Sequence, residues 1–207
     1  MTISVYQLKP AFTNLLRPLA TGLVKAGATA NQVTVAACVL SVFFAGVLFL
    51  YPNSALAWAL LPVWLFLRMA LNAIDGIMAR EFGQKSRLGA LLNEMTDVVA
   101  DAALYIPFAL LPGVHVQAVA LFVWMALLTE FAGVLAVMIS APRRYDGPLG
   151  KSDRAFILGV VAVLCVCAFT WDWNIAFIFN AIFYLCSALM AWTVYNRLRN
   201  SLAGGAA

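Results

Sequence analysis

The sequence predicts an all-α membrane protein with six transmembrane helices, preceded by an amphipathic helix at the cytoplasmic surface. Three observations support this fold class. The 207 residues are 64% hydrophobic and only 11% charged, whereas a soluble domain carries roughly 25% charged residues. Apolar runs long enough to cross a bilayer alternate with short connections. Basic residues gather in every second connection, which is the pattern that the positive-inside rule associates with membrane topology.

Residues 1–28 are expected to form an amphipathic juxtamembrane helix. Within this segment, Val5–Lys25 has apolar residues at helical spacing, and basic residues recur every eight positions at Lys9, Arg17 and Lys25. The pattern is typical of a helix that lies on the cytoplasmic surface of the membrane. It fits equally a helix that packs on the protein's own core, so both interpretations stay open.

A six-helix transmembrane domain is expected over residues 29–200, followed by a flexible tail at residues 201–207. A spanning helix needs roughly 17–25 apolar residues, and Pro52, Pro112 and Pro142 lie at or just past the ends of apolar runs, where helices stop easily. The six expected spans are Asn31–Leu50, Ala55–Ala79, Leu88–Leu111, Val116–Ser140, Ala155–Thr170 and Ile175–Tyr195.

Charge placement predicts the orientation of these spans. The loops near Tyr51–Ser54, Pro112–His115 and Trp171–Asn174 contain no Lys or Arg, whereas the connections between them are basic. Both termini are therefore expected in the cytoplasm. We expect an integral protein of a bacterial inner membrane with its active site near the cytoplasmic face.

Carboxylate and amide side chains recur at helical spacing inside the second and third expected spans. Asn72, Asp75 and Ala79 share one helical face, because they are three and four residues apart. Charge in a bilayer is costly, so such a cluster is a candidate functional site by default. The corresponding positions on the third span, each four residues from the next, are Gly89, Asn93, Asp97 and Asp101.

These two helices are expected to be antiparallel neighbours that line one cavity, because only Glu81–Arg87 connects them. Two carboxylates with amide oxygens form a ligand set that suits Mg²⁺, Mn²⁺ or Ca²⁺. Gly76, Ala79 and Gly89 leave room for a bulky ligand or a neighbouring backbone. Arg80 can bind a phosphate with its planar guanidinium group. The pattern indicates a site for a diphosphate and a metal ion.

The same residues resemble the signature of the CDP-alcohol phosphotransferase family, which is D-x-x-D-G-x-x-A-R, eight residues, and then G-x-x-x-D-x-x-x-D. Upstream, the segment from Ala30 through Asn31 to Thr34 is similar to the P-N-x-x-T that often opens the family's first span. The resemblance covers most of the chain. The residues that match the main signature are Asp75, Gly76, Ala79, Arg80, Gly89 and Asp97.

The resemblance implies a metal-dependent enzyme of phospholipid synthesis. Such an enzyme moves a phosphatidyl group from CDP-diacylglycerol, or a similar CDP-linked lipid, to a small alcohol that is sometimes phosphorylated, and releases CMP. Asp97 would be the catalytic base that deprotonates the acceptor. Membrane lipid is a further expected partner, a homodimer is an open arrangement, and no nucleic-acid partner is expected. The implied ligands of one or two Mg²⁺ or Mn²⁺ ions are Asn72, Asp75, Asn93 and Asp97, and the implied substrate-binding residues are Asn31, Thr34, Gly76, Ala79, Arg80 and Gly89.

Two positions depart from the family pattern, because Asn72 and Asn93 replace its first and third acids. An Asn still offers a carbonyl oxygen, but the site loses two negative charges. Three interpretations stay open: one metal ion instead of two, compensation by Asp101 as an additional metal ligand, or a catalytically impaired relative. In a second alignment Asp97 and Asp101 are the third and fourth acids. That alignment moves Gly89 out of register, so we prefer the first.

The basic segment RRYDGPLGKSDR, which follows the fourth expected span, is a second candidate binding region. Lys151 and Arg154 are expected to bind an anionic acceptor. Arg143 and Arg144 are better explained by membrane topology and contact with lipid headgroups.

Three charged residues are expected deep in the membrane, at roughly 15–20 Å from the cytoplasmic helix ends. They are Arg68, Asp101 and Glu130. An unpaired charge at that depth would be expensive, so we expect these residues to form a buried network that joins the second, third and fourth spans.

Two other functions compete with the enzyme. An ion or solute transporter also places Asp, Asn and Arg inside the membrane, although no inverted repeat or pair of broken helices is evident. A degenerate family member that binds a CDP-lipid as a partner protein is the other alternative. Release of CMP from CDP-diacylglycerol would separate the enzyme from both.

Overall fold

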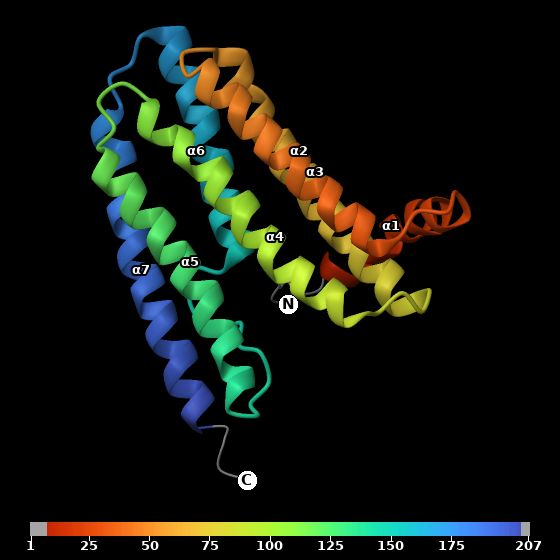
Figure 1. Ribbon diagram of the computed structural model, residues 1–207. Helices are drawn as coiled ribbons and strands as arrows, with labels where there is room; N and C mark the ends of the chain where they lie inside the picture. Colours follow the sequence, from red (N-terminus) through yellow and green to blue (C-terminus); the bar gives the residue numbers. More distant parts are fainter. Residues whose placement is uncertain (1–7, 204–207) are drawn as a thin grey trace, which may run out of the picture. The chain divides into compact units, whose positions relative to one another are not determined.

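The computed structural model describes residues 8–203, and this part of the chain is helical with no strand (Figure 1). Residues 1–7 of the expected amphipathic helix and residues 204–207 of the expected tail lie outside the described residues. The helices are α1 (Leu8–Lys25), α2 (Ala30–Leu50), α3 (Ala55–Glu81), α4 (Arg87–Tyr105), the 3-10 helix η2 (Ile106–Leu110), α5 (Val116–Met138), α6 (Lys151–Trp171) and α7 (Ala176–Ala203).

Five of these helices, α2, α3, α5, α6 and α7, are long and apolar enough to cross a membrane. This finding confirms the expected class, an all-α membrane protein. The third expected span is different, because its α-helix α4 ends at Tyr105 and the chain continues as η2. Three carboxylates, those of Glu94, Asp97 and Asp101, lower the hydropathy of α4. The count of six spans therefore stays a prediction.

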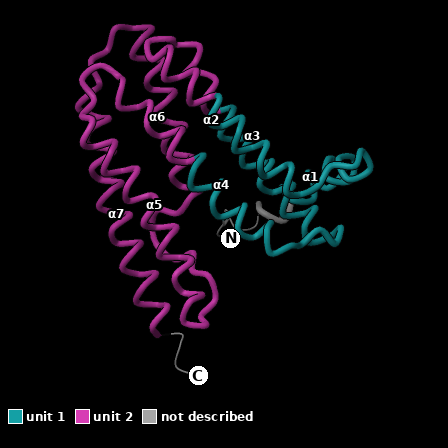
Figure 2. Tube along the Cα trace, in the orientation of Figure 1, with its two compact units in different colours: residues 1–43, 63–100 teal, residues 44–62, 101–207 magenta. Residues whose placement is uncertain are grey.

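The chain folds into two compact units (Figure 2). Unit 1 comprises residues 1–43 and 63–100, and unit 2 comprises residues 44–62 and 101–207. The helices α2, α3 and α4 each contribute residues to both units. All of the residues that match the main family signature belong to unit 1.

The core of unit 1 joins α1, α2 and α3. Leu16 and Ala20 of α1 are buried in the same apolar cluster as Ile77 and Met78 of α3. Other apolar residues of α1, such as Leu15, are exposed. One side of α1 thus packs on the protein's own core, and contact of its exposed apolar residues with the membrane surface stays a prediction.

Local hydrogen bonds explain where α2 begins. Thr29 Oγ1 accepts from the backbone N–H of Gln32 at 3.3 Å, and Gln32 Oε1 accepts from the backbone N–H of Thr29 at 2.9 Å. This reciprocal pair satisfies two N–H groups that the first turn of a helix leaves without partners. Gln84, in the connection from α3 to α4, accepts from the Ala30 N–H at 2.6 Å. The start of α2 is thereby tied to the connection that precedes α4.

The core of unit 2 is aromatic. Phe108 of η2 contacts Trp58 of α3 and Phe183 of α7 in edge-to-face geometry, with ring centroids 4.7 and 5.7 Å apart. Phe122 of α5 contacts Phe183 and Tyr105 in the same way. These packed rings hold η2, α5 and α7 together, since such pairs add to the free energy of simple burial.

Two expected boundaries need correction. α6 begins at Lys151 rather than Ala155, because the Asp153 carboxylate accepts from the Gly150 N–H at 2.9 Å at its first turn. α7 continues to Ala203, so residues 201–203 are helical rather than part of a flexible tail. Ser201 in this last turn is buried, and its hydroxyl donates to the Arg197 carbonyl oxygen one turn earlier.

Candidate active site

Asp75 lies on the face of α3 that meets α2. Its carboxylate Oδ2 accepts a hydrogen bond of 2.7 Å from Thr34 Oγ1, and both side chains are buried. The same hydroxyl lies 3.0 Å from the Ala30 carbonyl oxygen, one turn back on α2. This contact fixes the position of the Asp75 carboxylate relative to the first turns of α2. The P-N-x-x-T-like segment therefore contacts Asp75, which is the first acid of the signature in this chain.

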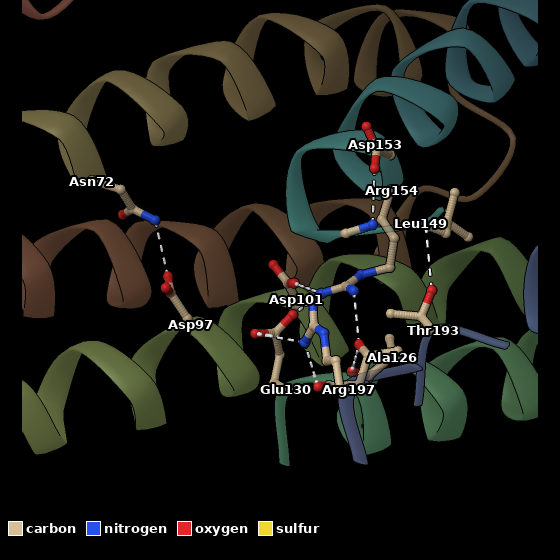
Figure 3. Close-up of polar contacts among 12 residues, drawn as sticks. Asn72, Asp97, Asp101, Ala126, Glu130, Leu149, Asp153, Arg154, Thr193 and Arg197 are labelled. Atoms are coloured by element: carbon tan, nitrogen blue, oxygen red, sulfur yellow. Dashed lines mark hydrogen bonds and ion pairs between the residues drawn. The ribbon is translucent and has the colours of Figure 1, made fainter. Parts of the chain in front are cut away.

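Asp97 lies on α4 and is held by two side chains of α3. Its Oδ1 accepts from Asn72 Nδ2 at 2.9 Å and from Arg68 Nη2 at 3.3 Å. Figure 3 shows the Asn72 amide pointing toward the Asp97 carboxylate. Arg68 is buried, whereas Asp97 is partly accessible. The structure thus pairs α3 and α4 through their polar faces, as the spacing of these residues predicts.

Gly76 leaves space where the Arg80 side chain folds back over α3. A Cβ atom at position 76 would lie 3.0 Å from Arg80 Nη1 and 3.1 Å from Nη2. The guanidinium therefore occupies space that any larger residue would contest. Arg80 itself is exposed, so its donors are accessible to a ligand.

Gly89 is required where α4 begins beside α2. A Cβ atom at position 89 would lie 2.7 Å from Asn31 Oδ1 and 3.0 Å from Ser86 Oγ. The Ser86 hydroxyl oxygen also accepts from the Gly89 N–H at 2.9 Å and caps α4. Two residues of the upstream segment, Asn31 and Thr34, thus contact or closely approach signature residues.

The oxygen donors of unit 1 suit a hard divalent cation, although only two of the four side chains carry a negative charge. Asp75 and Asp97 supply carboxylates, and Asn72 and Asn93 supply neutral amides. Among the residues that the structure describes, no group of three or more His, Cys, Asp or Glu side chains could hold a metal ion. The residues therefore fit a cation whose coordination is completed by amide oxygens, water or phosphate, as is usual for Mg²⁺.

A second polar cluster lies in unit 2 and centres on Arg154. This side chain is fully buried and donates to Asp101 at 3.3 Å, to Glu130 at 2.8 Å and to Thr129 Oγ1 at 2.9 Å (Figure 3). Asp101 and Glu130 are therefore joined in a buried network, as expected, and the cation that joins them is Arg154. The expected link to Arg68 stays a prediction, because Arg68 belongs to unit 1, where it pairs with Asp97.

Two further arginines converge on Glu130. Arg143 Nη2 lies 3.1 Å from its carboxylate, and Arg197 Nη1 lies 4.0 Å away. Arg197 also donates to the backbone oxygens of Thr129 and Asp146. Sequence reasoning assigned Arg143 to topology and missed the role of Arg197. Arg197 lies after the last expected span, which ends at Tyr195, so hydropathy gave no signal of its burial inside α7.

The connection between α5 and α6 contains a more accessible ion pair. Arg144 donates to both carboxylate oxygens of Asp146, at 2.7 and 3.0 Å. Partial burial would raise the pKa of Asp146, but hydrogen bonds and the charge of Arg144 outweigh burial and hold this pKa below its ordinary value. Lys151 lies in the first turn of α6, partly exposed.

The predicted site residues thus fall into two groups. In unit 1 the structure brings together Asn31, Thr34, Asn72, Asp75, Gly76, Arg80, Gly89 and Asp97, with Ala79 and Asn93 on the same two helices. In unit 2 it places Asp101, Lys151 and Arg154. Asp101 is paired with Arg154 there, so its charge is partly compensated within that unit.

Comparisons with known proteins agree with this geometry. The family model for CDP-alcohol phosphatidyltransferases matches residues 28–195. The inner membrane protein YnbA of Escherichia coli (strain K12) is 44% identical over 201 residues, which are 97% of this chain and 97% of that protein. A phosphatidylinositol phosphate synthase of Mycobacteroides abscessus is 38% identical over 97 residues, which cover 47% of this chain but only 42% of that protein.

Solved structures share the fold. The Mycobacterium tuberculosis phosphatidylinositol phosphate synthase with CDP-DAG bound has a TM-score of 0.74 and 23% identity, and the match covers 94% of this chain and 98% of that chain. The same synthase in complex with manganese and citrate gives a TM-score of 0.73, with coverage of 93% and 92%. At this identity the likeness establishes the fold alone.

Proposed function

Because the chain belongs to the CDP-alcohol phosphatidyltransferase family, and is thus a membrane phosphotransferase, we propose that it moves a phosphatidyl group from CDP-diacylglycerol to an alcohol and releases CMP. The observation that carries this proposal is the assembly of the signature residues in unit 1. Asp75, Arg80 and Asp97 are all present, and Thr34, Gly76 and Asn72 hold or accommodate them. The structural neighbour with CDP-DAG bound supports the choice of donor.

The proposed roles follow from the chemistry of each group. Arg80, which is exposed beside Gly76, binds the diphosphate with its planar donors. Asp97 accepts the proton of the acceptor hydroxyl, while Arg68 and Asn72 hold the carboxylate in position. The acceptor oxygen then bonds to the β-phosphorus, and the bond from this phosphorus to the oxygen of CMP breaks. A bound Mg²⁺ or Mn²⁺ ion would neutralise charge on the diphosphate, and Asp75, Asp97, Asn72 and Asn93 are the residues that would hold it.

The acceptor alcohol is proposed only by class. Lys151 is partly exposed at the start of α6 and could contact an anionic acceptor. Arg154 is fully buried and paired with Asp101 and Glu130, so we assign it a positioning role instead of direct contact. By analogy with the inner membrane relative, we place the protein in a bacterial inner membrane. The placement of basic residues in every second connection supports cytoplasmic termini and a site near the cytoplasmic face.

The test is release of CMP by the purified full-length protein. The assay contains CDP-diacylglycerol, Mg²⁺ or Mn²⁺, and each of a panel of alcohols that includes phosphorylated and zwitterionic acceptors. We expect CMP release with at least one acceptor and none from Asp97→Asn. The matched control is Asp172→Asn, the same chemical change at an exposed position after α6. Equal turnover by Asp97→Asn and the wild type would refute the assignment of the base.

A second function is favoured by Asn72 and Asn93, which remove two charges from the family's set of acids. A protein that binds a CDP-lipid without turning it over would show saturable binding of CDP-diacylglycerol and no CMP release with any acceptor. The same preparation answers both questions.

A further inference from the structure

Three arginines converge on the Glu130 carboxylate from three segments of unit 2. Arg154 Nη2 of α6 lies 2.8 Å from Oε1, Arg143 Nη2 of the α5–α6 connection lies 3.1 Å from Oε2, and Arg197 Nη1 of α7 lies 4.0 Å from Oε2. Figure 3 shows Arg154 and Arg197 directed toward Glu130 from different helices. The carboxylate therefore occupies the point at which the three guanidinium groups meet.

The arginine of α7 is held in place by contacts other than the ion pair. Arg197 Nε donates to the Asp146 carbonyl oxygen at 3.0 Å, and Arg197 Nη1 donates to the Thr129 carbonyl oxygen. Gly133 lies one turn after Glu130 on α5, and a Cβ atom there would lie 3.2 Å from Arg197 Nη1. The backbone of unit 2 thus fixes this guanidinium beside Glu130, and the absence of a side chain at position 133 leaves space for it.

The three arginine side chains differ in exposure. Arg154 is fully buried and Arg197 is 3% exposed, whereas Arg143 is 23% exposed. The guanidinium carbon of Arg143 lies 4.5 Å from the centre of the Tyr145 ring. Solvent screens the two buried charges poorly, so their neighbourhood favours a negative charge. Solvent reaches the cluster mainly beside Arg143.

Converging guanidinium groups are a common arrangement for binding phosphate. Their planar donors pair with carboxylate and with phosphate oxygens in the same way, and arginine clusters recognise phosphorylated ligands in many proteins. In unit 2 the oxygens at this point belong to Glu130, and Asp101 lies 3.3 Å from the same Arg154 guanidinium. A phosphate brought to the cluster would meet these carboxylates as like charges. The cluster thus has the geometry of an anion site in which the anion is part of the chain.

This arrangement changes what the basic segment after α5 can bind. Arg154 of this segment was expected to bind an anionic acceptor. The structure instead pairs Arg143 and Arg154 with Glu130, and it pairs Arg144 with Asp146. A phosphate group at these guanidinium groups would have to displace a carboxylate of the chain. The segment therefore disfavours an acceptor that carries a phosphate ester.

We propose that Glu130 fills the position of an anion that Arg143, Arg154 and Arg197 would otherwise bind, and that the acceptor alcohol consequently carries no phosphate group. Glu130 is then a residue that determines acceptor specificity. The statement about the acceptor rests on the proposed function, whereas the statement about the anion site does not.

The first test is rescue of Glu130→Ala by an added anion. Truncation to alanine removes the carboxylate and leaves space beside the three guanidinium groups. Thermal unfolding of the full-length protein in a neutral detergent is followed at increasing inorganic phosphate and constant ionic strength. We expect a saturable rise in the Tm of Glu130→Ala that is at least about twice the rise in the wild type, because the wild type measures only the general effect of phosphate on stability.

Two further variants make this test specific. The matched control Glu81→Ala removes a carboxylate from an exposed pair with Arg17, and it should respond to phosphate as the wild type does. The double variant Glu130→Ala, Arg143→Gln should lose the additional rise. A purely structural role of Glu130 predicts a lowered Tm that phosphate does not restore. A response of Glu130→Ala no larger than that of the wild type would therefore overturn the proposal.

The second test compares alcohols with their phosphate esters in the CMP-release assay. The pairs are glycerol with glycerol 3-phosphate and inositol with inositol phosphate, and serine is added as a zwitterionic acceptor. We expect the wild-type kcat/KM for an unphosphorylated acceptor to exceed that for every phosphate ester by roughly tenfold or more, because a like charge disfavours the ester. Equal use of an ester, or a preference for it, would contradict the assignment of the acceptor class.

A third measurement covers the case in which Glu130→Ala does not fold at any phosphate concentration. Binding of glycerol 3-phosphate is then measured by equilibrium dialysis on the wild type and on Arg143→Gln. Binding that Arg143→Gln abolishes would refute the proposal, whereas no binding, or binding that this change leaves unaltered, would support it. If no acceptor releases CMP, the proposed function fails, and the phosphate response of Glu130→Ala still decides whether Glu130 fills an anion site.

Discussion

The hydroxyl of Thr34 donates to the carboxylate of Asp75 across 2.7 Å, and both groups are buried. The two residues are 41 positions apart in the chain, so this hydrogen bond ties the start of α2 to the signature segment of α3. Thr34 thereby orients a proposed metal ligand without needing to touch substrate.

Thr34→Val should weaken the apparent affinity for Mg²⁺ or Mn²⁺ by about 10–100-fold, because an outer hydrogen bond to a metal ligand is typically worth that much. Valine has nearly the same shape and lacks the donor, so the fold should be retained. The measurement is the dependence of CMP release on metal concentration. Thr34→Ser, which keeps the hydroxyl, is the matched control and should stay close to the wild type. Equal metal dependence of the Val and Ser variants would contradict the role given to this hydrogen bond.

Gly76→Ala should displace the Arg80 guanidinium, since the new Cβ would lie 3.0 Å from Nη1. The side chain of Arg80 is flexible, so the protein should fold while binding of the diphosphate weakens. We expect the KM for CDP-diacylglycerol to rise about tenfold or more, in line with the loss of one charge-assisted hydrogen bond.

The control for Gly76→Ala is Gly46→Ala in α2, where a Cβ atom would meet nothing within 4 Å. That variant should bind the donor as the wild type does. An unchanged KM in Gly76→Ala would mean that Arg80 does not depend on the space above Gly76.

The pairing of α3 with α4 could be predicted from the sequence. Helical spacing puts Asn72 and Asp75 on one face of α3 and Asp97 on the polar face of α4, and the short connection makes the two helices neighbours. The contact of Arg68 with Asp97 was within reach for the same reason, since Arg68 lies one turn before Asn72. Arg68 was expected to pair with Asp101 and Glu130 only because the three residues lie at a similar depth in the membrane. A similar depth does not show which residues are in contact.

Contacts between distant segments could not be predicted from periodicity. Thr34 meets Asp75, and Asn31 meets Gly89, across long stretches of chain; only the family resemblance pointed to this upstream segment. The start of α6 was expected at Ala155, because hydropathy ignores the Asp153 cap that begins the helix four residues earlier. That difference moved Arg154 from a connection into a buried helix position.

Asp146→Asn should lower stability at neutral pH and leave it unchanged in acid. The pKa of Asp146 in the folded protein is below its ordinary value, since hydrogen bonds from Arg144 outweigh the effect of burial. A group with a depressed pKa stabilises the fold above its unfolded pKa of about 3.9, and this contribution is lost as the pH falls through the folded pKa.

Thermal unfolding of the wild type and Asp146→Asn should therefore differ at pH 7 and at pH 5. The difference should begin to narrow near the unfolded pKa of about 3.9 and disappear only below the lower pKa of the folded protein. The effect should be small, because the ion pair is partly exposed. The exposed Asp172→Asn change serves as the control. A difference that persists at the lowest pH would show that something other than ionisation of Asp146 is responsible.

Arg154→Met should destabilise the protein strongly. The substitution leaves Asp101 and Glu130 buried without the guanidinium that lies 3.3 and 2.8 Å from them. Breaking a buried ion pair by removal of one partner costs about 3–5 kcal/mol. Arg143 and Arg197 still approach Glu130, so we expect the lower end of this range. The measurement is the free energy of unfolding in mixed detergent.

A double-mutant cycle separates the ion pair from simple loss of packing. Glu130→Gln removes the charge that Arg154 compensates, so the double variant Arg154→Met, Glu130→Gln should be less destabilised than the sum of the single changes, by about 0.5–3 kcal/mol. Arg17→Met, which breaks the exposed pair of Arg17 with Glu81, should cause no measurable loss and is the comparison for a surface ion pair. Strict additivity of the two buried changes would mean that Arg154 stabilises unit 2 by filling space, and that its bond to Glu130 contributes nothing to the fold.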